Sequence, residues 1–236
     1  MPAGSGVGDV AVVIPARSEA DRIAATVTAA AGLAGVGLVV VVDDGSRDGT
    51  GVLARRAGAV VIRHGRNRGK SAAMQTGANA VGAVDQRERR ERPRHLLFLD
   101  ADLAESAAQA GPLAVPVIAG TADMTIAVFT TTVKLGGHGL VVGLSGAGIR
   151  RAVGWQPAQP LNGQRCLTRA AFEAARPLAP GWGVETALTI DLLRKGLRVT
   201  EVEVELAHRA TGTGLRAQLH RARQLTDVAR ALAVRI

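Results

Sequence analysis

Short apolar runs alternate with segments of helical periodicity through the first hundred residues of the chain. Each run is apolar throughout instead of alternating with polar residues, which is typical of parallel strands buried on both faces. The pattern predicts an α/β fold in which a mostly parallel sheet is flanked by helices. The expected strands lie at residues 10–14, 38–42, 59–63 and 95–100, and the expected helices at 18–33, with Ser18 as N-cap, 52–57 and 71–81.

The second half of the chain has a weaker pattern. We expect strands at 124–128, 161–167 and 198–206, and helices at 181–196 and 215–234. The glycine-rich stretch 136–148 is expected to be flexible or tightly packed, and the charged segment 85–94 to be a solvated loop or a frayed helix end. Since no internal repeat or linker interrupts the chain, we expect one domain spanning residues 1–236.

Composition narrows the function classes. The 236 residues are 47% hydrophobic, without a run long enough to cross a bilayer or a signal-peptide core, so we expect a soluble, cytoplasmic protein. A single cysteine, Cys166, excludes an internal disulfide and a cysteine-based metal site. The net charge of +9 is compatible with an anionic partner, but we attribute it to an Arg- and Ala-rich composition. Nucleic acid is disfavoured because aromatic residues, at 2%, are too few for base stacking.

Two acids follow the fourth expected strand, in the stretch HLLFLDADL. Residues i and i+2 of a strand point to the same side, so Asp100 and Asp102 can face one cation together. Carboxylate oxygens combined with phosphates and water are the ligands that Mg²⁺ and Mn²⁺ prefer. The alternative, which weighs equally for the pair alone, is that the acids cap the helix that follows.

Further polar groups follow other strands. Asp43 and Asp44 follow the second strand in a turn, where their carboxylates could either bond to the turn's own backbone or bind a ribose or base. The turn resembles a calcium-binding loop, but Arg55 occupies the position that needs glutamate, so calcium binding is rejected. The basic loop 65–71 has three residues between its glycines instead of the four of a P-loop, yet Lys70 at a helix start suits an anion. Because ligands of such sheets bind at the carboxyl ends of strands, these groups are expected at one edge.

Four ordered segments carry a resemblance to a known family: VVIPARSEADRI, VVVVDDGSRDGT, GRNRGKSAA and LLFLDADL. They resemble the nucleotide-diphospho-sugar half of family 2 glycosyltransferases with the GT-A fold. The later segments QPLNGQRCLTRAAF, GWGVETALTIDLLRKG and VELAHRATG resemble the glucosyl-3-phosphoglycerate synthases and their bacterial relatives. The resemblance covers nearly the whole chain and implies a nucleotide-sugar half at residues 1–103 and an acceptor half at 104–236. One departure is Ser18, where the family commonly has asparagine.

The resemblance implies a role for residues in both halves. Asp102, Asp100 and His208 would hold Mg²⁺ or Mn²⁺, with Asp102 the main ligand. Glu185 would lie near the donor sugar and acceptor, Lys70 and Asp102 would take part in catalysis with it, and Trp182 would be a sugar platform. The nucleotide would contact Pro15, Ala16, Arg17, Glu19, Asp43, Asp44, Ser46, Lys70, Asp100, Ala101 and Arg209, and the sugar or acceptor would contact Asn162, Gly163, Trp182, Gly183 and Glu185.

The sequence therefore predicts a metal-dependent glycosyltransferase that moves a sugar from a UDP-sugar, or else a GDP-sugar, to a phosphorylated or small polar acceptor. The alternative is a nucleotidyltransferase or a sugar-nucleotide-binding protein without transferase activity. A nucleotidyltransferase usually carries a Gly-rich, Lys/Arg-containing loop directly after its first strand, and Pro15–Glu19 is not such a loop. The expected partners are the donor and a small acceptor, without nucleic acid or a membrane-spanning segment; peripheral membrane contact and a homodimer stay open.

Overall fold

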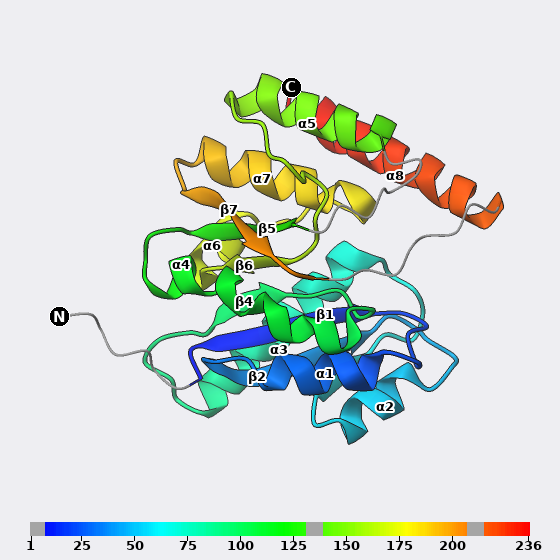
Figure 1. Ribbon diagram of the computed structural model, residues 1–236, viewed down its shortest axis with the longest axis vertical. Coiled ribbons are helices and arrows are strands. Elements are labelled where there is room, and N and C mark those ends of the chain that lie inside the picture. Colours follow the sequence, from blue (N-terminus) through cyan, green and yellow to red (C-terminus); the bar gives the residue numbers. More distant parts are fainter. Residues whose placement is uncertain (1–7, 131–138, 207–214) are drawn as a thin grey trace.

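The structure is a computed structural model that describes residues 8–130, 139–206 and 215–236. One sheet of seven strands runs through it in the order β3-β2-β1-β4-β6-β5-β7 (Figure 1). β6 is antiparallel to both of its neighbours, whereas the other pairings are parallel, so the expected mostly parallel sheet is confirmed. The strands are β1 Val10–Ala16, β2 Val36–Asp43, β3 Val60–Arg63, β4 His95–Phe98, β5 Met124–Phe129, β6 Arg165–Leu167 and β7 Val199–Val204.

Helices cover both faces of the sheet and add a further layer beyond one of them (Figure 1). The longest are α3 in the first half and α5 and α8 in the second. The α-helices are α1 Ile23–Ala31, α2 Thr50–Arg56, α3 Lys70–Arg87, α4 Val115–Ile118, α5 Gly139–Val153, α6 Arg169–Ala174, α7 Val184–Arg194 and α8 Leu215–Ala233, and the 3₁₀ segments are η1 Ala104–Leu113 and η2 Gly181–Gly183.

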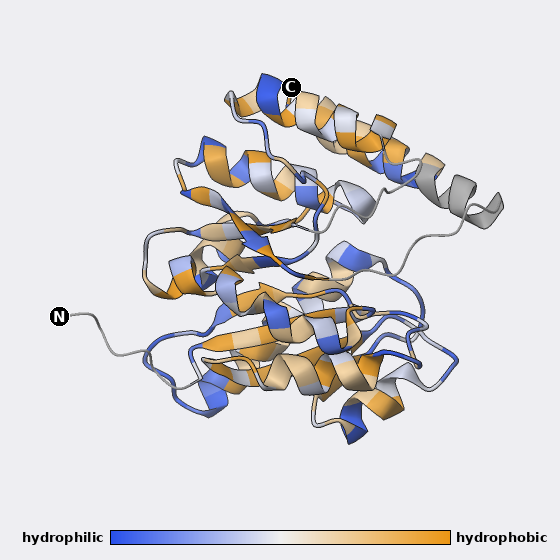
Figure 2. Ribbon diagram, viewed as in Figure 1, coloured by the Kyte–Doolittle hydropathy of each residue, from blue (hydrophilic) through white to orange (hydrophobic). Residues whose placement is uncertain are grey.

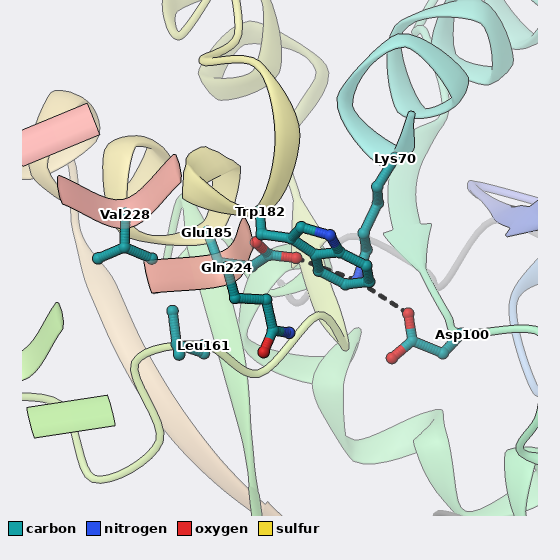
Figure 3. A pocket seen from close by; sticks show the side chains of 7 residues that line it. All are labelled: Lys70, Asp100, Leu161, Trp182, Glu185, Gln224 and Val228. Carbon is teal, nitrogen blue, oxygen red and sulfur yellow. Dashed lines mark hydrogen bonds and ion pairs between the residues drawn. The ribbon is translucent and has the colours of Figure 1, made fainter. Parts of the chain in front are cut away.

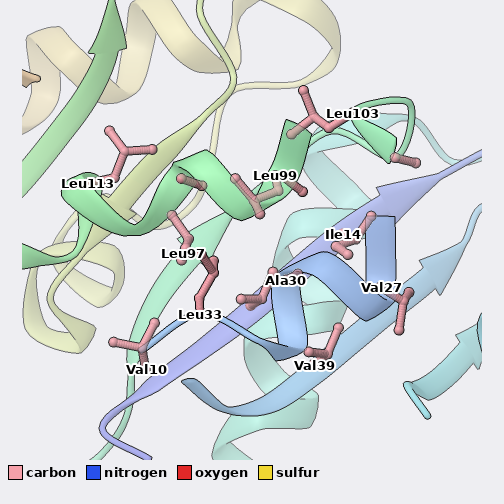
Figure 4. Close-up of a cluster of buried hydrophobic side chains, with 14 of the residues drawn as sticks. Val10, Ile14, Val27, Ala30, Leu33, Val39, Leu97, Leu99, Leu103 and Leu113 are labelled. Atoms are coloured by element: carbon pink, nitrogen blue, oxygen red, sulfur yellow. The ribbon is translucent and has the colours of Figure 1, made fainter. Parts of the chain in front are cut away.

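The continuous apolar runs are explained by burial on two sides. Val12 and Ile14 of β1 belong to the cluster under α1 and η1 (Figure 4), whereas Ala11 and Val13 belong to the cluster under α3 and α7. Central strands are correspondingly coloured as hydrophobic along most of their length (Figure 2). α3 can approach β1 closely because Gly77 has no side chain: a Cβ there would lie 2.3 Å from Val13 Cγ1.

A separate apolar cluster joins α5, α7 and α8. It contains Ile149, Ile190, Val228 and Leu232, and a Cβ on Gly148 would lie 2.4 Å from Leu232 Cδ2. The described part of the glycine-rich stretch is thus helix, and among its glycines only Gly148 is tightly packed, since a Cβ on Gly139, Gly143 or Gly146 would meet nothing within 4 Å. No helix among the described residues is both long and apolar enough to traverse a bilayer.

Three local predictions differ from the structure: the cap of α1, the solvent exposure of the charged segment 85–94 and the length of β6. Ser18 does not cap α1, because the helix begins at Ile23 and Ser18 adopts a left-handed φ of 58°. The charged segment 85–94 is not simply solvated: α3 continues to Arg87, and the buried side chains of Asp85 and Arg94 form an ion pair. β6 includes only the last three residues of the expected strand, since the preceding residues form a turn at the sheet edge.

Candidate active site

Lys70 lies at the centre of a charged cluster on the carboxyl edge of the sheet (Figure 3). It is the first residue of α3, preceded by Gly69 with a φ of 88°. Its Nζ lies 2.9 Å from Asp100 Oδ1 and 3.0 Å from Glu185 Oε1. One ammonium therefore joins an acid that follows β4 to an acid in the first turn of α7, 85 positions further along the chain.

Burial strengthens this pairing. The side chains of Lys70 and Glu185 are 14% and 4% exposed, so little water screens their attraction. Burial by itself lowers the pKa of Lys70, but the charges and hydrogen bonds of Asp100 and Glu185 together outweigh it, and the pKa of Lys70 is raised. The lysine is accordingly a fixed positive charge at neutral pH.

Gln164 fixes the carboxylate of Asp100 from the other side. Its buried amide donates from Nε2 to Asp100 Oδ2 at 2.9 Å, and its Oε1 accepts from the Asp100 backbone N–H at 3.1 Å. Both oxygens of Asp100 thus have protein partners, one in Lys70 and one in Gln164. Gln164 directly precedes β6, and the antiparallel direction of that strand places it at this edge.

Arg165 supports the backbone of the helix that carries Glu185. Its guanidinium is 1% exposed and donates to the carbonyl oxygens of Glu185, at 3.0 Å, Asn162 and Pro160, and to Thr189 Oγ1. Burial lowers the pKa of Arg165 to about 10, against the opposing charges of Glu185 and Glu201. A buried charge with this many acceptors holds the turn before β6 against α7.

A small cavity adjoins the charged cluster. It measures about 170 Å³ and is lined by Lys70, Asp100, Leu161, Trp182, Glu185, Gln224 and Val228 (Figure 3). The Trp182 ring centroid lies 5.9 Å from Lys70 Nζ, within range of a cation–π attraction. Gly163 is also needed for close approach, because a Cβ there would lie 2.3 Å from Lys70 Nζ.

The turns after β1 and β2 are bound together through backbone N–H groups. The N–H of Ser18 donates to Ser46 Oγ at 3.0 Å, and that of Glu19 donates to Thr50 Oγ1 at 3.0 Å. Asp43 accepts from the Ser46 N–H at 2.8 Å within its own turn. The segment 15–19, expected to contact a nucleotide, is thus held in place by the acidic turn.

Asp44 positions the basic loop instead of facing an open cavity. It is 5% exposed, and its oxygens accept from the N–H groups of Arg68 and Gly69, both at 2.8 Å, and contact His64 Nδ1 at 2.7 Å. Gly45 lets the two loops touch, because a Cβ there would lie 2.9 Å from the Arg66 carbonyl carbon. This geometry places Lys70 immediately after a clamped loop.

The acid pair offers oxygen donors suited to Mg²⁺ or Mn²⁺. The turn that holds it is anchored by Thr26 of α1, which donates to the Ala101 carbonyl at 2.9 Å and accepts from the Ala104 N–H at 2.8 Å. Asp102 is half-buried, and the oxygens of Asp100 bond to Lys70 and Gln164. Within the described ranges, three metal-binding side chains do not converge; the expected third ligand, His208, and Arg209 lie outside those ranges.

The structure brings together Lys70, Asp100, Glu185, Trp182 and Gly163, as expected from the sequence. Other expected residues have mainly packing contacts. The Asn162 amide bonds to the Ala127 carbonyl at 2.8 Å, and Gly183 makes room for α8, since its Cβ would lie 2.6 Å from the Asp227 carbonyl oxygen. Pro15 is half-buried, Ala16 buried and Arg17 exposed beside the acidic turn.

Three polar site residues escaped the sequence analysis, namely Gln164, Arg165 and Gln224, as did the apolar cavity residues Leu161 and Val228. Arg165 gave a signal, because a charged residue within a short apolar strand must find buried partners. Gln164 lies in the NGQR segment but has no distinguishing pattern of its own. Gln224 is one polar residue among many on an amphipathic helix, and only the packing of α8 shows that it faces the cavity.

A mostly parallel sheet flanked by helices, with an acid pair and a buried lysine at its carboxyl edge, places the protein in the α/β class whose ligands bind at strand ends. The chain belongs to Glycosyl transferase family 2, whose sequence model matches residues 11–137. The Haloferax volcanii protein named Glycosyltransferase AglJ is 27% identical over 213 residues, covering 86% of this chain. The chain spans 65% of the length of that relative.

Solved structures share the fold over nearly the whole chain. Glucosyl-3-phosphoglycerate synthase from Mycobacterium tuberculosis, in complex with Mn²⁺, UDP and phosphoglyceric acid, gives a TM-score of 0.75 at 24% identity, covering 98% of this chain and 79% of that one. The same enzyme with Mg²⁺ and UDP gives 0.74 at 23% identity, covering 98% and 80%. The expected GT-A fold is thereby confirmed.

Proposed function

We propose that the protein is a metal-dependent glycosyltransferase that moves a sugar from a nucleotide-diphosphate donor to a phosphorylated or small polar acceptor. The observation that carries the proposal is the buried Lys70 joined to Asp100 and Glu185 at the carboxyl edge of the sheet. Family membership supports transfer, and the UDP in the structural neighbours favours a UDP-sugar over a GDP-sugar.

The chain's own residues would stabilise the leaving group. Departure of the sugar leaves negative charge on a diphosphate, and Lys70 is a fixed ammonium beside the acid pair that follows β4. Asp102, with Asp100 beside it and His208 as the third expected ligand, would hold Mg²⁺ or Mn²⁺, which supplies charge neutralisation when bound. Arg209 would add a further positive charge to the nucleotide side.

Glu185 has two candidate roles. In an inverting reaction it would be the base that takes the proton of the acceptor hydroxyl. In a retaining reaction the leaving phosphate can take that proton, and Glu185 would position the sugar or acceptor. Glu185→Gln separates them: a loss of many orders of magnitude in kcat supports the base, whereas a modest loss supports positioning.

The first experiment measures thermal unfolding with UDP, GDP, UDP-glucose, GDP-mannose and ATP, each with and without Mn²⁺. A ligand that binds only the folded state raises the Tm by mass action. We expect a Mn²⁺-dependent rise with one nucleoside diphosphate and its sugar, and its absence in Asp102→Asn. A rise in Tm with ATP alone would favour a nucleotidyltransferase. If a sugar nucleotide binds, an activity assay then measures release of its sugar and transfer to 3-phosphoglycerate or other small acceptors. Binding with neither release nor transfer would favour a sugar-nucleotide-binding protein.

A further inference from the structure

The α8 wall of the cavity is held in a fixed position. Gln224 and Val228 line the cavity four residues apart, a spacing that places them on one side of the helix. Between them, Asp227 accepts from the Trp182 backbone N–H at 3.1 Å. A Cβ on Gly181 would lie 2.1 Å from Asp227 Oδ2, so η2 and α8 are in direct contact. The position of Gln224 relative to Trp182 is therefore set by packing.

Gln224 brings an unused hydrogen-bonding group into this cavity. Its Oε1 is buried and has no hydrogen-bond partner among the residues that the structure describes. Figure 3 shows its carboxamide directed into the space between Leu161 and the Lys70–Asp100 pair. A buried acceptor without a partner destabilises the folded protein, and such groups commonly mark a place where a ligand or water binds.

The lining suits a single sugar ring. Leu161 and Val228 offer apolar surface, the Trp182 ring offers an aromatic face, and Glu185 and Gln224 offer groups that bind hydroxyls. A water molecule takes about 30 Å³ of liquid volume, so a cavity of about 170 Å³ has room for one small ring. Because Lys70 and Asp100, proposed for the diphosphate, form one end, the group beside them is the sugar joined to that diphosphate.

We propose that Gln224 binds a hydroxyl of the transferred sugar through its carboxamide and thereby contributes to donor-sugar selectivity. The assignment rests on the proposed function, since it places the sugar of a nucleotide donor in this cavity. It extends the sugar site from the loop and helix residues of the sheet edge to the C-terminal helix. An apolar side chain of similar size at this position removes the hydroxyl contact without disturbing the nucleotide.

The test compares Gln224→Leu with Gln86→Leu, the same change at an exposed position near the end of α3. Calorimetric titration with Mn²⁺ measures the Kd of UDP and of UDP-glucose, and of GDP and GDP-mannose in parallel. We expect Gln224→Leu to weaken the sugar nucleotide about tenfold and to leave the Kd of the diphosphate unchanged. The Tm without ligand should not fall, because the change removes an unpaired buried polar group.

Deoxy analogues of the bound donor identify the contact. Wild type should bind one mono-deoxy UDP-hexose more weakly than the parent sugar, and Gln224→Leu should lose that discrimination. The assignment would be overturned if Gln224→Leu weakened binding of the nucleoside diphosphate and the sugar nucleotide equally, or left the Kd of the sugar nucleotide unchanged. It would also be overturned if the substitution changed only the KM of the acceptor. Should Gln224→Leu not fold, Gln224→Asn, which withdraws the carboxamide by one methylene, takes its place. If wild type binds none of the four nucleotides, the proposed function itself fails.

Discussion

Removing Lys70 tests whether the charged cluster is an ion-paired unit. In Lys70→Met, Glu185 loses a partner at 3.0 Å in a position where its side chain is 4% exposed. At an effective dielectric of about 20, two unit charges at this distance attract by about 5.5 kcal/mol. Desolvation of the pair offsets part of this attraction, so we expect Lys70→Met to lower the free energy of unfolding by about 3 kcal/mol.

A double-mutant cycle isolates the pair. Glu185→Gln alone should cost about 1.5 kcal/mol, because Lys70 keeps Asp100 as a partner at 2.9 Å. The double variant should cost about 2.5 kcal/mol instead of the additive 4.5, which is a coupling energy of about 2 kcal/mol. Urea unfolding followed by circular dichroism gives these values, provided that the m-values agree. Lys195→Met, at an exposed lysine, is the matched control and should change stability by less than about 0.5 kcal/mol.

The pH dependence provides an independent check. The pKa of Lys70 is raised in the folded state. Its contribution to the free energy of unfolding is therefore fully present below the pKa of an unfolded lysine, about 10.4, and is lost only as the pH rises through the pKa of Lys70 in the folded protein. The coupling energy should therefore be constant from pH 7 to 9. Costs that simply add, within about 0.5 kcal/mol, would refute the ion pair.

Three further predictions concern neighbouring groups. Gly163→Ala should displace the flexible end of Lys70, whose Nζ would lie 2.3 Å from the new Cβ, and so weaken diphosphate binding and lower the Tm, though by less than Lys70→Met does; unaltered binding would contradict the close approach. Asp44→Ala should accelerate amide hydrogen exchange at Arg68, whose N–H loses its carboxylate acceptor, and unchanged exchange would exclude the clamp. Burial lowers the pKa of His95 in the folded state, against the charge of Asp9, so stability should fall as the pH drops below about 6.5, and His95→Gln should flatten that slope.

The sequence predicted the first half of the fold well because its strands are buried on both faces. Such strands read as unbroken apolar runs, and the side chains that follow them necessarily meet at one sheet edge. The positions of Lys70 and Asp100 follow from that rule alone. Strand ends shifted by only a few residues, as in β4, which ends at Phe98.

The second half was less predictable because its contacts are distant in sequence. Gln164 meets Asp100 only because β6 runs antiparallel, and a strand of three residues carries no pattern that reveals its direction. Asp85 and Arg94 form a buried ion pair, but in the sequence they are two of many charged residues in the segment 85–94, and nothing there distinguishes them. Gln224 depends on the rotation of α8 about its axis, which the contacts at Gly181 and Gly183 fix.

The reversed direction of β6 makes the two halves of the chain mutually dependent. A fragment ending at residue 103 would retain both acids and the lysine, but Gln164, which bonds to Asp100, and Glu185, which pairs with Lys70, come from the remainder. The boundary that separates the nucleotide side from the acceptor side in sequence therefore does not separate two independent modules. Exchanging one half for that of a distant relative should yield an ordered site only where the new segment brings its own equivalent of Gln164.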